Sequence, residues 1–109
     1  MPVKLFLFVF IIIFSKSFAG EIINENNLEK KEGLLFNKLT NELFTGFVEF
    51  KYNNGKIRSK GSFKMGKEEG YWEDYNEDGS LFSKGNYING KPHGNFKFYH
   101  ENGILEEEG

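Results

Sequence analysis

Residues 70–93 read GYWEDYNEDGSLFSKGNYINGKPH, and the stretches on either side repeat their pattern. Residues 46–69 read GFVEFKYNNGKIRSKGSFKMGKEE, and residues 94–109 read GNFKFYHENGILEEEG. Eleven of the 13 glycines recur at one fixed spacing, that of Gly46, Gly70 and Gly94. A fixed period of this length is typical of repeat proteins, in which each unit packs on its neighbours.

Each unit carries one hairpin signal, an Asn-Gly or Asp-Gly pair between apolar residues. These pairs are Asn54-Gly55, Asp78-Gly79 and Asn102-Gly103. They favour the two-residue type I′ turn, because both central residues of that turn need a positive φ. The resulting register predicts the cross-strand pairs Tyr52–Ile57, Val48–Gly61, Trp72–Gly85 and Phe96–Gly109. A large side chain beside a cross-strand glycine fills the space that the glycine leaves. We therefore expect the repeated glycines to serve partly as turn formers and partly as space for rings.

The alternation of residues along the strands separates two faces. One face is predicted to form the core and carries Val48, Trp72, Phe96, Ile57, Leu81, Leu105, Phe63 and Tyr87. The other face is expected to meet solvent or a partner and carries Phe47, Glu49, Lys51, Tyr71, Glu73, Tyr75, Lys97 and Tyr99.

Three segments precede the repeats. Residues 1–19, MPVKLFLFVFIIIFSKSFA, have one lysine before a ten-residue apolar run and small residues ahead of Gly20. This layout is typical of a helical secretory signal peptide cleaved after Ala19, and the run is shorter than the ~20 residues that span a bilayer. We expect a secreted, periplasmic or envelope protein, with an uncleaved membrane anchor as the alternative.

The next two segments lead into the repeats. Residues 20–32 favour a polar tether or frayed helix. Residues 33–45 are expected to form a capping segment with short strands at Leu35-Phe36 and Leu43-Phe44.

The units resemble the MORN repeat in its bacterial variant form. The repeat positions that carry the resemblance are Gly46, Gly55, Gly61, Gly70, Trp72, Gly79, Gly85, Gly94, Phe96 and Gly103, with Tyr75, Leu81, Tyr87, Asn89, Gly90 and Lys91 in the best-matching unit. The first unit departs from the pattern, with Lys51 where a tyrosine is expected. The resemblance covers about residues 33–109 and implies an all-β, single-layer twisted antiparallel sheet of consecutive hairpins without an enzymatic site. Bacterial proteins of this family are commonly labelled antitoxins of toxin–antitoxin systems. In eukaryotes the repeats are associated with phospholipid binding, membrane attachment or dimerisation.

Composition excludes most catalytic chemistry. The chain has no cysteine, which excludes disulfides, thiolate metal sites and a cysteine nucleophile. Its two histidines, His93 and His100, lack the third ligand that a metal site needs, and the serines have no nucleophile context. We therefore expect no catalytic residue, metal or cofactor. The formal charge of −2 also argues against a nucleic-acid binder. Without residues 1–19 the chain keeps 12 basic and 16 acidic residues, a formal charge of −4.

Charge is segregated between neighbouring hairpins. Residues 50–67 hold six bases and no acid, whereas residues 68–78 hold six acids and no base. One interpretation is attraction that orders the units. The other is a surface for anionic headgroups or an acidic partner, built on Lys56, Arg58, Lys60 and Lys64.

The predicted function is protein binding or scaffolding at the cell envelope, through the exposed aromatic residues Tyr71, Tyr75 and Tyr99. Phospholipid binding through the basic first hairpin and neutralisation of a toxin are the alternatives. An open sheet also has unpaired edges, so pairing with a second copy is a further expectation.

Overall fold

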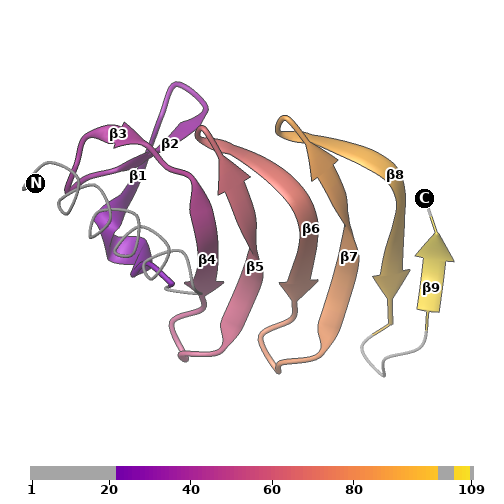
Figure 1. Ribbon diagram of the computed structural model, residues 1–109. Coiled ribbons are helices and arrows are strands. Elements are labelled where there is room, and N and C mark those ends of the chain that lie inside the picture. Colours follow the sequence, from indigo (N-terminus) through magenta and orange to yellow (C-terminus); the bar gives the residue numbers. More distant parts are fainter. Residues whose placement is uncertain (1–21, 101–104, 109) are drawn as a thin grey trace, which may run out of the picture.

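The computed structural model describes residues 22–100 and, for the backbone, residues 105–108 (Figure 1). This part of the chain contains one 3-10 turn and nine strands in two antiparallel sheets. The elements are η1 (Glu25–Asn27), β1 (Leu28–Lys31), β2 (Leu34–Asn37), β3 (Glu42–Leu43), β4 (Gly46–Lys51), β5 (Ile57–Lys64), β6 (Lys67–Tyr75), β7 (Leu81–Ile88), β8 (Lys91–Tyr99) and β9 (Leu105–Glu108). The predicted signal peptide, the Asn102-Gly103 turn and the Phe96–Gly109 pair lie outside the described residues.

The all-β expectation of consecutive antiparallel hairpins is confirmed. The larger sheet has the order β4-β5-β6-β7-β8-β9, so every strand pairs with its neighbours in sequence. Figure 1 shows these strands side by side in a twisted array. The predicted pairs Val48–Gly61 and Trp72–Gly85 are both present in the register.

The turns after β4 and β6 differ from the expected type I′ geometry. The Gly55 N–H donates to the Tyr52 carbonyl, and the Tyr52 N–H donates to the Lys56 carbonyl. Three residues therefore form the loop, and Gly55, with φ 87°, is the one in the left-handed region. Asn76, Gly79 and Ser80 repeat this pattern in the next unit. The type I′ assignment at Asn54-Gly55 and Asp78-Gly79 is wrong, because a three-residue loop needs only one residue with positive φ.

A bulge beside each of these loops restores the predicted register. Lys51 pairs with Ile57, whereas Phe50 pairs with Ser59, so Arg58 is an extra residue in β5. The predicted Tyr52–Ile57 pair is therefore wrong. One residue added to the loop and one added to the strand compensate for each other, and Val48 still lies opposite Gly61.

Three two-residue turns have two positive φ values, two of them at the opposite end of the larger sheet and one in the smaller sheet. They are Met65-Gly66 between β5 and β6, Asn89-Gly90 between β7 and β8, and Glu32-Gly33 between β1 and β2. The first two also donate a hydrogen bond to the segment that precedes their hairpin in the sequence. The Gly66 N–H donates to the Phe44 carbonyl, and at the equivalent position of the next unit the Gly90 N–H donates to the Glu68 carbonyl.

A second bulge explains the remaining glycines. Lys60 pairs with Glu73 and Ser62 pairs with Glu69, so Gly61 alone opposes the three residues 70–72 of β6. Gly70 adopts φ 86° in this bulge. As a result the Trp72 ring lies over Gly61, where an added Cβ would be 2.2 Å from it. Phe96 lies over Gly85 in the same way, at 2.5 Å. The repeated glycines do leave space for rings, but each ring lies over the glycine of the preceding strand.

Aromatic rings connect the units along the core face. The buried core consists of Leu28, Leu35, Phe44, Val48, Phe63 and Trp72, with Tyr87 packed against it. Phe63 and Trp72 meet edge to face with centroids 5.3 Å apart, and Tyr87 and Phe96 do so at 5.4 Å. Among the expected core residues, Val48, Trp72 and Phe63 are buried, whereas Ile57, Leu81, Tyr87 and Phe96 are partly buried.

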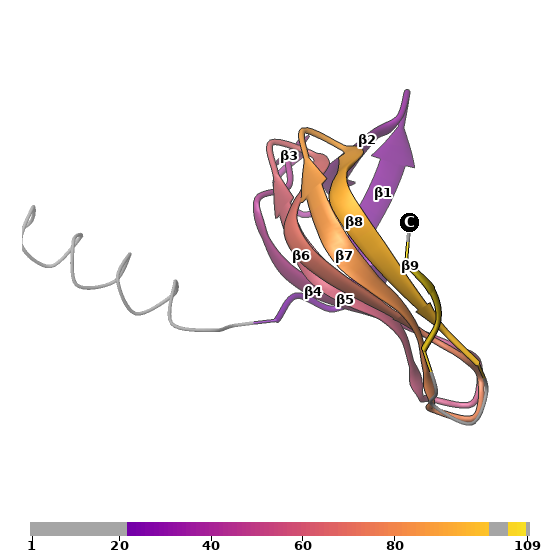
Figure 2. The ribbon, with the colours of Figure 1, turned by 90° about the vertical axis from the view of Figure 1, so that its right-hand side faces the viewer.

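The N-terminal segment forms a second layer, which differs from the single-layer expectation. Residues 20–32 were expected as a tether, yet η1 and β1 form here and Leu28 enters the core. Ile23 makes a parallel bridge to Val48, and the Lys51 N–H donates to a Glu25 carboxylate oxygen at 2.9 Å. Figure 2 shows β1 on the hollow side of the larger sheet. The predicted short strands are present, since Phe36 of β2 pairs with Leu43 of β3.

Candidate binding surfaces

The first surface lies on the side of the larger sheet that faces away from the core. We call it the tyrosine face and define it as Lys60, Tyr71, Glu73, Tyr75, Lys84 and Tyr99. At its centre the Tyr71 hydroxyl donates to one oxygen of the Glu73 carboxylate at 2.9 Å. The Tyr75 hydroxyl donates to the other oxygen at 2.5 Å. The Lys60 ammonium lies 3.7 Å from the same carboxylate, so three side chains converge on Glu73.

Cross-strand pairing extends this centre across the sheet. Glu73 pairs with Lys60 of β5 on one side and with Lys84 of β7 on the other. The Lys60 ammonium lies 5.8 Å from the Tyr75 ring centroid, and the Lys84 ammonium lies 5.8 Å from that of Tyr99. Both of these tyrosine rings thus have a cation close enough for a cation–π interaction. The face is a row of alternating charges between aromatic rings.

The protonation states of the tyrosine face follow from these contacts. Burial, together with the hydrogen bond to Glu73, raises the pKa of Tyr71 to about 12. The same two causes raise the pKa of Tyr75. The hydrogen bond from Tyr75 is the largest of the effects that lower the pKa of Glu73. At neutral pH both hydroxyls therefore remain donors and Glu73 remains an ionised acceptor.

The three tyrosines predicted to bind a partner lie on this one face. Tyr71 and Tyr75 share Glu73, and Tyr99 is close enough to contribute to the raised pKa of Tyr71. Glu73 and Lys84 were not predicted as site residues from the sequence. The sequence does contain a signal for these two residues. Glu73 repeats the position of Glu49 and Lys84 repeats that of Lys60, so Glu73 and Lys84 belong to one cross-strand row.

The structure distributes the predicted anion-binding residues over several surfaces. These residues are Lys56, Arg58, Lys60 and Lys64. Lys56 lies in the loop after β4, where its ammonium donates to the Asp78 carbonyl at 3.2 Å. Lys64 ends β5 at the opposite end of the sheet. Arg58 lies over an aromatic ring on the core side, and Lys60 belongs to the tyrosine face. The contacts of Lys56 and Lys60 join a basic hairpin to its acidic neighbour.

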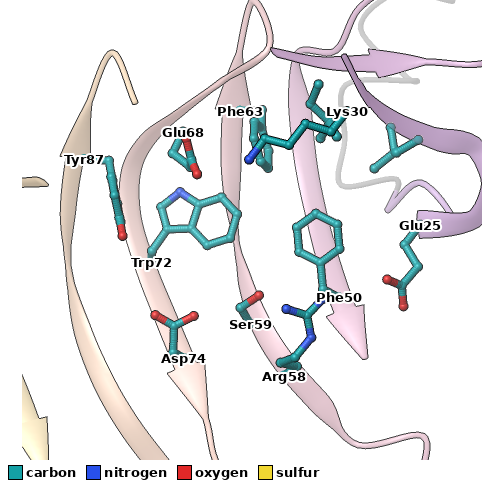
Figure 3. Close-up of a pocket in the computed structure, with 12 residues that line it drawn as sticks. Glu25, Lys30, Phe50, Arg58, Ser59, Phe63, Glu68, Trp72, Asp74 and Tyr87 are labelled. Atoms are coloured by element: carbon teal, nitrogen blue, oxygen red, sulfur yellow. The ribbon is translucent and has the colours of Figure 1, made fainter. Parts of the chain in front are cut away.

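The second surface is a pocket of about 480 Å³ between the N-terminal layer and the core side of the larger sheet (Figure 3). Its walls are aromatic, and its charged groups are of both signs. The lining residues include Phe50, Phe63, Trp72, Tyr87, Glu25, Lys30, Arg58, Glu68, Ser59 and Asp74. Figure 3 shows Trp72 and Tyr87 on adjacent strands, with Asp74 and Ser59 below the indole ring and Lys30 reaching in from β1.

Asp74 is the unusual residue of this pocket. It occupies the same repeat position as Phe50 in the first unit and Phe98 in the third, and replaces a ring by a carboxylate. Its cross-strand partners Ser59 and Ser83 are small and only 7% and 3% exposed. Burial raises the pKa of Asp74, partly offset by a hydrogen bond from Ser83 and by the charge of Arg58. Comparison of equivalent repeat positions would have revealed this exception in the sequence.

The described residues offer neither a metal cluster nor a membrane helix. Within residues 22–100 and 105–108, no three His, Cys, Asp or Glu residues are grouped closely enough to hold a metal ion. In the same part of the chain, no helix has the length and apolar character required to cross a bilayer.

Three matches to one family model decide the family. Residues 46–65, 68–89 and 92–109 each match the model of the MORN repeat variant, and each match covers nearly all of one pair of strands, β4–β5, β6–β7 or β8–β9. The chain belongs to the MORN repeat variant family. MORN repeats are generally non-catalytic binding modules. Comparison with curated proteins gives no significant match, and comparison with solved structures gives none.

Proposed function

We propose that this MORN-repeat protein is an exported, non-catalytic module that binds a protein partner at the cell envelope through its tyrosine face. The observation that carries the proposal is the convergence of Tyr71 and Tyr75 on the Glu73 carboxylate. Tyr71 is 49% exposed, and Phe47, which alternates with buried Val48 and so lies on the same side of the sheet, is 42% exposed. Tyrosine and phenylalanine are enriched at protein interfaces.

The hydrogen bonds to Glu73 favour binding because they hold the rings in place before a partner arrives. A side chain that is already ordered loses less conformational entropy on association. The charged row of Lys60, Glu73 and Lys84 adds specificity, since a partner must present complementary charges in the same order. These features support a protein partner with both apolar and charged groups.

The partner test compares two matched variants. The double variant Tyr71→Ser/Tyr75→Ser removes the rings, and Leu39→Ser removes a 73% exposed apolar side chain in the loop between β2 and β3. Each protein, immobilised at equal folded concentration, is incubated with envelope extract. We expect the unmodified protein and Leu39→Ser to retain the same partner and the tyrosine variant to lose it. Equal retention by all three proteins would disprove a role for the tyrosine face.

Export is tested separately by determining the N-terminus of the protein purified from its compartment. The proposal predicts a chain that begins at Gly20 and fractionates with the envelope or the medium, because residues 1–19 have a signal-peptide layout. An intact chain beginning at Met1 in the cytosol would contradict export and would favour the antitoxin alternative.

The phospholipid alternative has less support from the geometry. Broad adsorption to an anionic bilayer needs several bases on one surface. Lys56 lies in the loop after β4, Arg58 lies on the core side, and Lys60 is paired with Glu73, so the four predicted bases do not form one surface. Sedimentation with anionic vesicles at low salt, lost in the variant Lys56→Glu/Arg58→Glu/Lys60→Glu, would restore that alternative. Pairing of two copies through a sheet edge stays a prediction that sedimentation equilibrium can test.

A further inference from the structure

The core side of the larger sheet carries a cross-strand row in which one residue breaks the pattern. The row runs through Phe50, Ser59, Asp74, Ser83 and Phe98. In this row the rings of the first and third repeats flank a carboxylate in the second. The two serines are buried and small, so they leave the space around Asp74 to the pocket.

The carboxylate of Asp74 has weak partners within the described residues. Its hydrogen bond from the Ser83 hydroxyl is long, at 3.3 Å. The ion pairs found in residues 22–100 do not include it. Arg58, whose charge it feels, places its guanidinium 5.5 Å from the Phe50 ring centroid instead. A partly buried carboxylate without an ion pair is costly, and a cationic group would stabilise it.

We propose that this pocket binds the guanidinium group of a ligand, with Asp74 as the anionic partner and the partly buried rings of Phe50 and Tyr87 as its aromatic walls. A guanidinium fits both features, because its planar fork can donate two hydrogen bonds to one carboxylate. Its face also stacks on aromatic rings, such as the partly buried rings of Phe50 and Tyr87. The volume of about 480 Å³ lies in the range of small-molecule sites.

The charges around the pocket favour a cation over an anion. The carboxylates of Glu25, Glu68 and Asp74 outnumber the bases Lys30 and Arg58, and both bases are exposed residues. The position of Arg58 over Phe50 also shows that the aromatic wall accommodates a guanidinium. Arg58 is therefore the internal competitor of the ligand.

The test uses the fluorescence of Trp72, which is the only tryptophan of the chain. The full-length protein is titrated with N-acetyl-arginine amide and, as an uncharged control of the same shape, with N-acetyl-citrulline amide. We expect a saturable change with the arginine compound alone. N-acetyl-lysine amide should bind more weakly, because an ammonium lacks the planar fork. Absence of a saturable change, or an equal response to citrulline or lysine, would overturn the proposal.

Variants of Asp74 assign the binding to this residue. Asp74→Asn should weaken arginine binding by at least about tenfold, because it removes a charge-assisted hydrogen bond. Asp74→Phe restores the residue of the other two repeats, so it should fold and bind no arginine compound. Binding by either variant as tight as that of the unmodified protein would overturn the proposal. The folding of each variant is checked by circular dichroism. If one variant fails to fold, the comparison of the arginine and citrulline compounds in the unmodified protein still tests the proposal.

Two further variants separate this site from its competitor and from the tyrosine face. Arg58→Gln should bind arginine amide as tightly as the unmodified protein or more tightly, because the internal guanidinium is removed. Loss of binding in Arg58→Gln would contradict the proposal. The variant Tyr71→Ser/Tyr75→Ser should bind arginine amide normally, since both tyrosines lie on the opposite side of the sheet from Trp72. A failure of arginine binding would therefore overturn the pocket proposal and leave the proposal of partner binding by the tyrosine face unaffected.

Discussion

One residue, Glu73, connects the side chains at the centre of the tyrosine face, because two hydroxyls and one ammonium converge on its carboxylate. Its pKa is lowered, with the hydrogen bond from Tyr75 as the largest cause. A carboxyl group with a lowered folded-state pKa stabilises the protein above its unfolded pKa, and this contribution is lost as pH falls through the folded value. The ionised Glu73 carboxylate therefore raises the free energy of unfolding at neutral pH, and this contribution is absent in acid.

Replacing Glu73 by Gln tests this linkage. We expect a loss of about 0.5–1 kcal/mol at pH 7, kept small because the site is open to solvent. The difference should shrink as pH falls below the unfolded pKa of glutamate and disappear only below the lowered folded-state pKa, where both proteins carry a neutral side chain. Urea denaturation at pH 7 and below that folded-state pKa measures it. Glu77→Gln is the control, since Glu77 is exposed and contributes no side-chain hydrogen bond among those found in the described residues. A loss that persists unchanged in acid would contradict the assignment.

Among the glycines in the described part of the chain, Gly61 has the least room for a side chain. A Cβ placed there would lie 2.2 Å from the Trp72 indole, close to the root of that side chain. Gly61→Ala should therefore destabilise the protein by about 2 kcal/mol or more, because the ring must leave its position. Ser62→Ala on the opposite side of the same strand should change stability by less than about 0.5 kcal/mol. Thermal unfolding followed by Trp72 fluorescence measures both. Equal stability of the two variants would show that the ring moves freely.

At the scale of the element, the sequence predicted the strands, their pairing and the positions of two turns, but the predicted type of those turns was wrong. The Asn-Gly and Asp-Gly pairs point to type I′ turns, yet their loops contain three residues. The register survived because the bulge at Arg58 offsets the longer loop. The dipeptides alone do not distinguish the two loop lengths, because the glycine suits the left-handed position of either loop. Met65-Gly66 was missed as a type I′ turn, because methionine is unusual at positive φ.

The two-residue turns provide a matched pair of substitutions. Met65 and Asn89 hold equivalent positions in successive units, with φ 50° and 54°. Asparagine tolerates the left-handed region better than methionine does. Met65→Asn should stabilise the protein by about 0.5–1 kcal/mol, and Asn89→Met should destabilise it by a similar amount. Chemical denaturation measures both changes. Shifts in the same direction for the two variants would refute the explanation through turn conformation.

For the whole molecule, the repeats were predictable and the layer that covers them was not. The regular glycine spacing and the alternation of Val48 and Trp72 with polar residues established the sheet and its core face. Residues 20–32 are mostly polar, and so they favoured a tether. The order of this segment depends on Leu28 and on contacts with the sheet, such as the Ile23–Val48 bridge. The pocket was missed for the same reason, because its second wall comes from this layer.

The covering layer should stabilise the first repeat most, because each unit of a repeat protein contacts only its neighbours. Leu28→Ala removes a buried side chain from β1 and should cost about 2 kcal/mol, or roughly 10 °C in melting temperature for a domain of this size. Glu29→Ala, the exposed neighbour, should cost less than about 0.5 kcal/mol. In hydrogen exchange, the Leu28 variant should lose protection in β4 before β7. Equal losses along the whole sheet would mean that the repeats unfold as one unit and that the covering layer stabilises all of them together.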